Sequence, residues 1–284
     1  FSMGPPAAHR NVLALGYHGA YNRIGIRRKA KGACSDFLLR AELNHDAMLR
    51  QPLTATGWRL LTFFHTYRSG CADKDEALLA RLRPVAHEFG DSPLPKIVDS
   101  YLRVLGLIIE WDKQRAGVAP TELGMVSLPH HAVRTIVLCR FDAHYVWPAS
   151  SLRLKWSKTN LAWRDVHESW EAERKASDLF IALPMAHAAP LARALRVSGA
   201  QAKHGPGHWL YRPLVAEIGE GAVHFIQNKT YSSSLVHLGM VQRRTDPKLF
   251  MLLDRSCEGL ALDACVRNDS DGGRRKGVDI GRSR

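Results

Sequence analysis

The chain has 284 residues, of which 45% are hydrophobic and 24% are charged, a composition typical of a folded protein with a substantial core. No apolar run approaches the roughly 20 residues that a membrane-spanning helix needs, so the sequence predicts no transmembrane segment. The 40 Lys and Arg residues outnumber the 27 Asp and Glu residues, and the resulting formal net charge of +13 favours a polyanionic partner.

Residues 1–34 carry six basic residues and no acidic one, and they show no sustained helical stripe. They are predicted to form an extended basic arm in which Tyr17 and Tyr21 stand among cations. Aromatic rings beside cations are typical of nucleic-acid-binding extensions; the alternative is that both tyrosines pack on the protein's own core. The candidate RNA-binding side chains of this arm are Arg23, Arg27, Arg28, Lys29 and Lys31.

The chain begins with Phe1-Ser2, a pair typical of a processed mitochondrial N-terminus, and import signals are rich in Arg and poor in acidic residues. We therefore expect the mitochondrial matrix as the location. A truncated or tagged cytoplasmic protein is the alternative.

Residues 35–120 are predicted to form a helical domain of four antiparallel helices. The second helix follows Thr56, because Trp58, Leu61, Phe64 and Tyr67 recur at helical spacing. The third covers residues 73–89, with a kink or break expected at Pro84. The fourth starts near residue 93 and continues to about residue 115.

Residues 121–268 are predicted to form a mixed α/β domain. Its expected strands are 132–141, 178–183, 209–218, 222–230 and 249–253, and its expected helices are 159–176 and 190–197. The runs 209–218 and 222–230 flank Gly219-Glu220-Gly221, which indicates a β-hairpin.

Two further basic segments are candidate RNA contacts. Ahead of the expected helix at 159–176, cations alternate with an indole, a combination that grips phosphate while stacking on a base; an amphipathic segment with a buried Trp is the alternative. Residues 269–284 contain almost no apolar residues and are predicted to form a flexible basic tail. The candidates in these two segments are Arg153, Lys155, Trp156, Lys158, Arg274, Arg275 and Lys276.

Known catalytic and metal-binding signatures are missing from the sequence. It contains no dinucleotide fingerprint, P-loop, nucleophile elbow or zinc-protease motif. The five cysteines form no CxxC pair, and His130-His131 and the pair His204 and His208 have no ligand-spaced carboxylate or thiol beside them. We therefore predict no catalytic residue, no metal and no cofactor.

One constellation suggests an enzyme. Arg212, followed about 20 residues later by Ser232-Ser233-Ser234, resembles the arginine and Ser-Thr-Ser elements of ADP-ribosyltransferases. The resemblance implies that Arg212 holds the phosphates of a dinucleotide and that the serines support its nicotinamide pocket. The Glu-x-Glu of that family has no counterpart, since Glu258 stands alone.

Taken together, the sequence predicts an α+β protein with a helical N-terminal bundle, a mixed α/β C-terminal region and basic tails. The predicted function is that of a non-catalytic structural subunit of a large ribonucleoprotein, above all a mitochondrial ribosome, with rRNA and neighbouring subunits as partners and no small-molecule substrate. An accessory subunit of a respiratory or ATP synthase complex is the second hypothesis, and an ADP-ribosyltransferase-like enzyme is the third.

Overall fold

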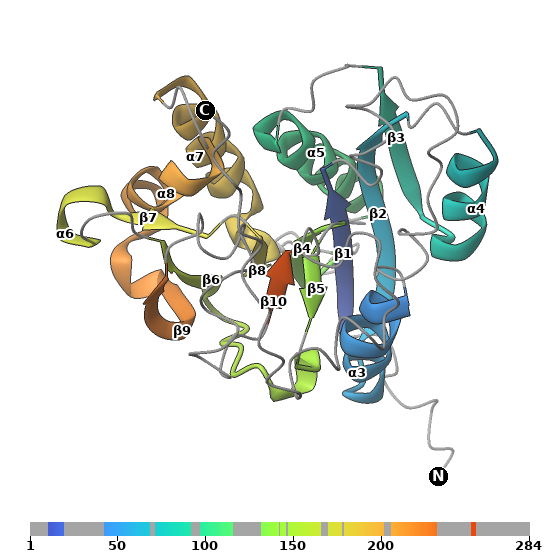
Figure 1. Cartoon of the computed structure of the whole chain (residues 1–284), viewed down its shortest axis with the longest axis horizontal. Helices are drawn as coiled ribbons and strands as arrows, with labels where there is room; N and C mark the ends of the chain where they lie inside the picture. Colours follow the sequence, from blue (N-terminus) through green and yellow to red (C-terminus); the bar gives the residue numbers. More distant parts are fainter. Residues whose placement is uncertain are drawn as a thin grey trace, which may run out of the picture.

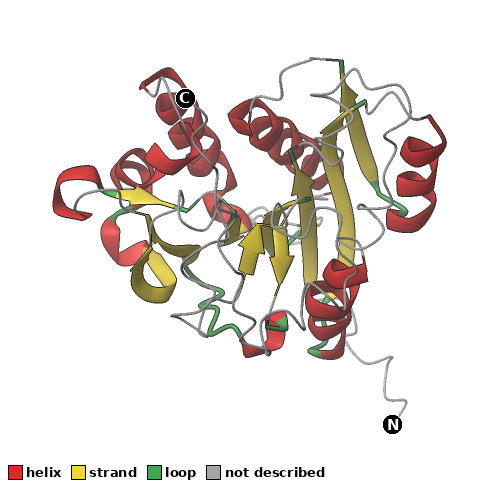
Figure 2. Cartoon of the chain, in the orientation of Figure 1, coloured by secondary structure: helices red, strands yellow, loops and turns green. Residues whose placement is uncertain are grey.

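A mixed β-sheet of eight strands forms the centre of the molecule (Figures 1 and 2). The computed structural model describes residues 11–19, 43–68, 72–91, 97–115, 132–141, 143–145, 147–165, 170–177, 179–201, 206–231 and 251–253. Seven strands follow one another in the order β3-β2-β1-β4-β8-β6-β7, and β9 pairs with β6 beside this row.

Half of the sheet is parallel. Each of the pairs β1–β2, β2–β3 and β1–β4 runs in the same direction. The four strands are β1 (Val12–His18), β2 (Arg59–Tyr67), β3 (Ala86–Gly90) and β4 (Thr135–Arg140). Both faces of β1, β2 and β4 are covered, and their side chains are therefore almost continuously apolar or buried, as expected for parallel strands inside a sheet.

The other half of the sheet is mixed. β8 (Phe180–Pro184) runs antiparallel to both β4 and β6 (Thr159–Asp165), so β6 runs in the direction of β4. β7 (Lys175–Ala176) is antiparallel to β6, and β9 (Val223–Tyr231) is parallel to it. A separate two-stranded antiparallel sheet joins β5 (Ala143–Tyr145) to β10 (Met251–Leu253).

Helices cover the two faces of the sheet (Figure 1). One face packs against α5 (Ile97–Arg115), α7 (Ala188–Gln201) and α8 (Tyr211–Ile218). The other packs against η1 (Asp46–Arg50), α3 (Gln51–Ala55) and α4 (Ala72–Leu82). The short elements are η2 (Ala149–Ser151), α6 (Trp170–Glu173), η3 (Met185–His187), η4 (Pro206–Leu210) and η5 (Glu220–Ala222).

Side chains of β1 alternate between the two cores, as strand geometry requires. Leu13, Leu15 and Tyr17 enter the core under α4, whereas Ala14 faces α5. Gly16 also faces α5, and a Cβ added there would lie 2.7 Å from Cδ2 of Leu138. A glycine at this position lets α5 approach the sheet closely.

The predicted N-terminal helical bundle is wrong. The second expected helix is strand β2, and the arm expected in residues 1–34 contributes the central strand β1. In β2 the residues from Leu61 to Tyr67 are all buried, because strands and helices cover them on every side. Apolar residues then occur on both faces of the strand, including the positions of a helical stripe, so their spacing could not separate a helix from a strand.

Most of the remaining element predictions are confirmed. The fourth helix is confirmed as α5, the helix at 190–197 as α7, and the strands at 132–141 and 178–183 as β4 and β8. α4 ends at Leu82 and β3 begins at Ala86, so the break near Pro84 is also confirmed. The helix at 159–176 is wrong, since β6 starts there, and the hairpin is wrong, since α8 occupies its first arm. Among the described helices, none is long and apolar enough to cross a membrane.

Candidate functional site

The carboxyl edge of the sheet collects polar strand ends. Strands β1, β2, β3, β4 and β6 all run in one direction, so their last residues lie along the same edge. The strand order reverses between β1 and β4, because the chain builds β2 and β3 on one side of β1 before it adds β4 on the other. In open α/β sheets, ligands bind outside the carboxyl ends of the strands at such a switch point.

Ser100 joins the ends of β1 and β2 to α5. Its Oγ accepts a hydrogen bond of 2.7 Å from the backbone N–H of Gly19 and donates one of 3.2 Å to the carbonyl of His65. Nδ1 of His65 lies 2.8 Å from the same Oγ and acts as the donor, since the single hydroxyl proton is already used. Burial lowers the pKa of His65, and this effect outweighs the opposing charge of Glu88.

A helical segment holds the chain that leaves β4. Asn44 accepts a hydrogen bond of 2.7 Å from the N–H of Tyr145 and donates one of 2.9 Å to its carbonyl, so the amide pairs with β5 as a neighbouring strand would. Nε2 of His45 donates to the carbonyl of Ala143. These contacts fix the chain on both sides of residue 144.

Stacked rings form a rigid base beneath this edge. The rings of Tyr17 and His45 are stacked, with centroids 5.4 Å apart and an interplanar angle of 5°. Tyr17 also stacks on Phe141 at 5.3 Å, and Tyr145 meets His45 edge-on. All four side chains are buried, so the edge between β1 and β4 rests on a packed layer.

Two ionisable groups meet at the end of β6. Nδ1 of His208, in η4, lies 2.7 Å from Oδ2 of Asp165, the last residue of β6. Both side chains are largely buried, at 17% and 8% exposure. A carboxylate beside an imidazole stabilises its protonated form, which is the arrangement of a proton acceptor.

A buried cation ends β4. Arg140 is 4% exposed, and its place between β1 and β8 puts a positive charge beside the switch point. The exposed Arg68 follows β2, and Asp91 follows β3. Nε of Arg68 lies 3.2 Å from Oδ1 of Asp91, so the two side chains form an ion pair. Guanidinium groups at such an edge suit phosphate oxygens.

The sequence-predicted RNA contacts do not gather at this edge. Arg153, Lys155, Trp156 and Lys158 lie in the segment before β6, at the opposite, amino edge of the sheet. Trp156 packs against Trp58 with ring centroids 5.0 Å apart. The other predicted contacts, Arg23, Arg27, Arg28, Lys29, Lys31, Arg274, Arg275 and Lys276, lie outside the described residues.

Two of the stacking residues of the RNA hypothesis are packed inside the protein, and the third, Tyr21, lies outside the described residues. Tyr17 is fully buried in the core, and Trp156 is half-buried against another indole. The ADP-ribosyltransferase resemblance is not supported either. Arg212 lies in α8 and donates to the carbonyl of Ala172 at 2.8 Å, while Ser232 to Ser234 fall outside the described residues.

Sequence reasoning missed the residues of the carboxyl edge. His18, His65, Ser100 and the pair Asp165–His208 belong to elements far apart in sequence, and three of those elements were predicted with the wrong structure or as an arm. No local sequence motif joins these residues. Within the part of the chain that the structure describes, no three His, Cys, Asp or Glu side chains come together as a metal site.

Comparisons with known proteins find likeness only in solved structures. No family model and no curated protein matches the sequence. Mouse xyloside xylosyltransferase 1 in its apo form is 11% identical, with a TM-score of 0.41 over 86% of this chain and 97% of that one. A protein of Desulfovibrio desulfuricans G20, named as a nucleotide-diphospho-sugar transferase, is 13% identical, with a TM-score of 0.43 over 91% and 95%.

A third solved structure is a glycosyltransferase involved in the glycosylation of the major capsid of PBCV-1, which is 7% identical with a TM-score of 0.36 over 77% of this chain and 82% of that one. The three named proteins are transferases, none of them a ribosomal component. The prediction of a non-catalytic, RNA-binding ribosomal subunit with rRNA as partner is corrected, because the similar solved structures are named as glycosyl or sugar transferases. Residues 35–120, expected to form a helical domain, contain strands β2 and β3 as well as helices α3, α4 and α5.

Proposed function

We propose that this chain is an enzyme that binds a nucleoside diphosphate sugar at the carboxyl edge between β1 and β4 and transfers its sugar to an acceptor. The observation that carries the proposal is the switch point in a sheet with four adjacent parallel strands. In open α/β sheets, the crevice at such a switch point, outside the carboxyl ends of the strands, is where ligands bind. Nucleotide sugars are the substrate class because the solved structures with a similar course of the chain are named for that chemistry.

The charges of the edge support a diphosphate ligand. Arg140 ends the strand on one side of the switch point, and the first turn of α5 contacts the strand on the other side through Ser100. The N-terminus of a helix carries a partial positive charge that adds to that of the guanidinium. The base of Tyr17, His45 and Phe141 keeps these groups in place before the ligand binds.

Sugar transfer also needs a group that accepts a proton. The hydroxyl oxygen of the acceptor forms a bond to the anomeric carbon, the bond from that carbon to the diphosphate oxygen breaks, and the nucleoside diphosphate leaves with the electron pair. The hydroxyl proton passes to Nε2 of His208, and Asp165 stabilises the imidazolium. Since only β8 separates β6 from β4, the pair lies about 10 Å along the edge from the switch point, on the acceptor side.

The test is calorimetric titration of the full chain with UDP, GDP and CDP and their glucose esters, followed by measurement of released nucleoside diphosphate. We expect one nucleotide class to bind and its sugar ester to turn over. His208→Gln is expected to lower kcat by about 10²-fold or more and to leave donor affinity within threefold. His187→Gln is the matched control, because His187 lies at the amino edge, where its Nδ1 is 2.9 Å from Oγ1 of Thr159. Absence of binding by every nucleotide would refute the proposal.

A further inference from the structure

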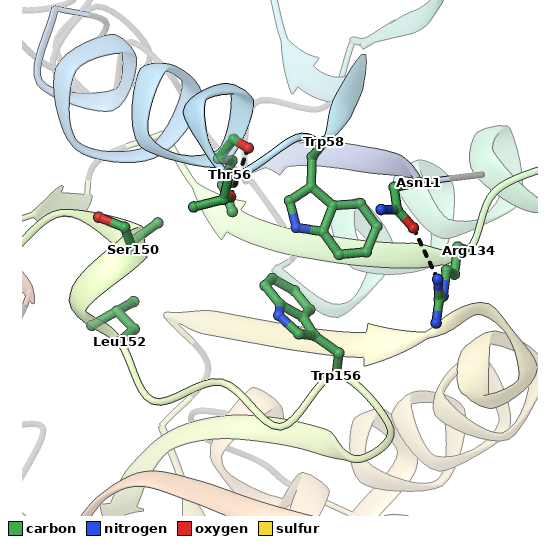
Figure 3. A pocket seen from close by; sticks show the side chains of 9 residues that line it. Asn11, Thr56, Trp58, Arg134, Ser150, Leu152 and Trp156 are labelled. Atoms are coloured by element: carbon green, nitrogen blue, oxygen red, sulfur yellow. Dashed lines mark hydrogen bonds between the residues drawn. The ribbon is translucent and has the colours of Figure 1, made fainter. Parts of the chain in front are cut away.

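A pocket of about 360 Å³ opens at the amino edge of the sheet, on the side opposite to the switch point (Figure 3). Three of its residues precede strands: Asn11 comes before β1, Trp58 before β2 and Arg134 before β4. Ser150 of η2 and Trp156 complete the wall. The volume lies within the usual range for small-ligand sites, about 300–1,000 Å³.

The backbone around the pocket is held firmly. The N–H of Arg59 donates to the carbonyl of Asn11 at 2.9 Å, and the N–H of Met185 donates to the carbonyl of Arg134 at 3.0 Å. The turn that carries Trp156 is held by the buried Asn160, which accepts from the N–H of Lys155 and donates to its carbonyl, to that of Lys158 and to that of Ala182. The positions of the side chains are therefore set before any ligand arrives.

Two indoles form an angled wall of this pocket. The ring centroids of Trp58 and Trp156 are 5.0 Å apart and the planes are inclined at 55°. This is the spacing of rings in direct contact, so no flat base fits between them. The exposed part of such a wall suits the C–H face of a puckered sugar ring, which combines apolar patches with hydroxyl groups at its rim.

The polar groups of the pocket favour an acidic sugar. Nη1 of Arg134 donates to Oδ1 of Asn11 at 2.9 Å, and the guanidinium, which is exposed, carries four further N–H groups. Thr56 and Ser150 lie on the opposite wall (Figure 3), where the Thr56 hydroxyl donates to the carbonyl of Leu53 at 2.8 Å. Among the described residues that line the pocket, none is acidic, and the neighbouring segment adds Lys155 and Lys158. A carboxylate or sulfate therefore meets positive charge without repulsion.

We propose that this pocket is a second carbohydrate site, which binds a saccharide that carries a carboxylate or sulfate group. It is separate from the carboxyl edge and does not depend on the proposed transferase activity. In the sequence, Trp156 and its flanking cations were interpreted as an RNA contact. The same residue types, arranged around an open pocket rather than along an extended nucleic-acid strand, fit a sugar ring with an acidic substituent.

The experiment is isothermal titration of the full chain with a glucuronate-containing disaccharide, a sulfated disaccharide, neutral cellobiose and UMP. We expect one of the acidic saccharides to bind at least tenfold more tightly than cellobiose and UMP. Trp156→Ala and Arg134→Gln are each expected to raise the Kd at least tenfold. Trp209→Ala and Arg196→Gln, at exposed residues outside the pocket, are expected to leave the Kd unchanged.

Thermal unfolding checks that each variant folds, and Trp156→Phe, which keeps an aromatic face, is expected to retain part of the affinity. Equal binding of neutral and acidic saccharides, preferential binding of UMP, no binding at all, or full affinity in Trp156→Ala would each overturn the proposal. Trp156→Ala is expected to retain turnover of a nucleotide sugar. Failure of the saccharide-binding proposal can therefore be distinguished from failure of the transferase proposal.

Discussion

The backbone N–H of Gly19 donates a 2.7 Å hydrogen bond to the hydroxyl of Ser100, and this contact ties the end of the central strand to the first turn of α5. The φ angle of Gly19 is 89°, a left-handed conformation in which the chain turns away from β1. The contact therefore determines how the chain leaves the strand at the switch point. The carboxyl edge is therefore held by a specific hydrogen bond between the end of β1 and α5.

Replacing Ser100 by Ala leaves the N–H of Gly19 and the ring of His65 without their shared partner. Because both groups are buried, we expect the free energy of unfolding to fall by about 1–3 kcal/mol. Denaturant unfolding measures the change. Ser151→Ala is the control, since the Ser151 hydroxyl bonds the carbonyl of Pro148 at an exposed position and its loss should cost about 0.5 kcal/mol or less. Equal effects of the two substitutions would contradict the role assigned to Ser100.

Acidification is expected to destabilise the protein through His65. Burial holds the pKa of His65 below its ordinary value, so the unfolded chain binds a proton that the folded chain resists. Stability should therefore be fully present above about pH 6.5 and decrease as the pH falls below it. Burial lowers the pKa of His187 and of His224 too, and these add to the same trend.

Unfolding free energies at pH 7.5 and 5.5 test this expectation, with His65→Gln as the comparison. The variant should lose less stability than the native chain over the same interval, because Gln can bond Ser100 but does not titrate. An identical pH dependence in both proteins would show that His65 is not responsible.

Gly16 is expected to tolerate no larger side chain. An added Cβ would meet Leu138 at 2.7 Å and Val104 at 3.1 Å, and overpacking of this kind costs about 1–3 kcal/mol. Gly106→Ala is the matched control. Gly106 lies in α5 with open space at its Cβ, and alanine there should stabilise by about 0.5–1 kcal/mol. If β1 and α5 pack as described, the midpoint of thermal unfolding should fall when Gly16 is replaced by Ala and rise in Gly106→Ala.

The sequence reveals the covering helices better than the central strands. α5 and α7 each bury one side and expose the other, and this pattern identified both from spacing alone. β2 and β6 are buried on both faces, and their apolar residues match a helical stripe as well as a strand. β1 is short and lies between basic and glycine-rich segments, so the composition of residues 1–34 led to the prediction of an extended arm.

The candidate site depends on contacts that no local pattern encodes. The register that places Leu13 beside Thr135, and with it β1 beside β4, creates the switch point. Ser100 reaches Gly19 only because α5 crosses behind these strands. Asp165 and His208 come together although two strands, β7 and β8, and two α-helices, α6 and α7, lie between them in the chain.

The thiol of Cys139 is expected to be inert in the folded protein. It is completely buried in β4, and burial raises its pKa far above the ordinary value, so almost no thiolate forms near neutral pH. Mass spectrometry after iodoacetamide treatment should find the peptide that contains Cys139 unmodified in buffer and modified in denaturant. Rapid labelling of Cys139 in the native state would show that β4 is not a central strand.

The most direct test of the central claim is hydrogen exchange of the full chain with and without a saturating nucleoside diphosphate. A ligand at the switch point should slow exchange in the peptides that end β1 and β4, which contain Gly19 and residues 140–145. Peptides of the amino edge, which contain Trp58 and Trp156, should be unaffected. Protection confined to the amino edge, or no protection anywhere, would contradict the assignment of the nucleotide to the carboxyl edge.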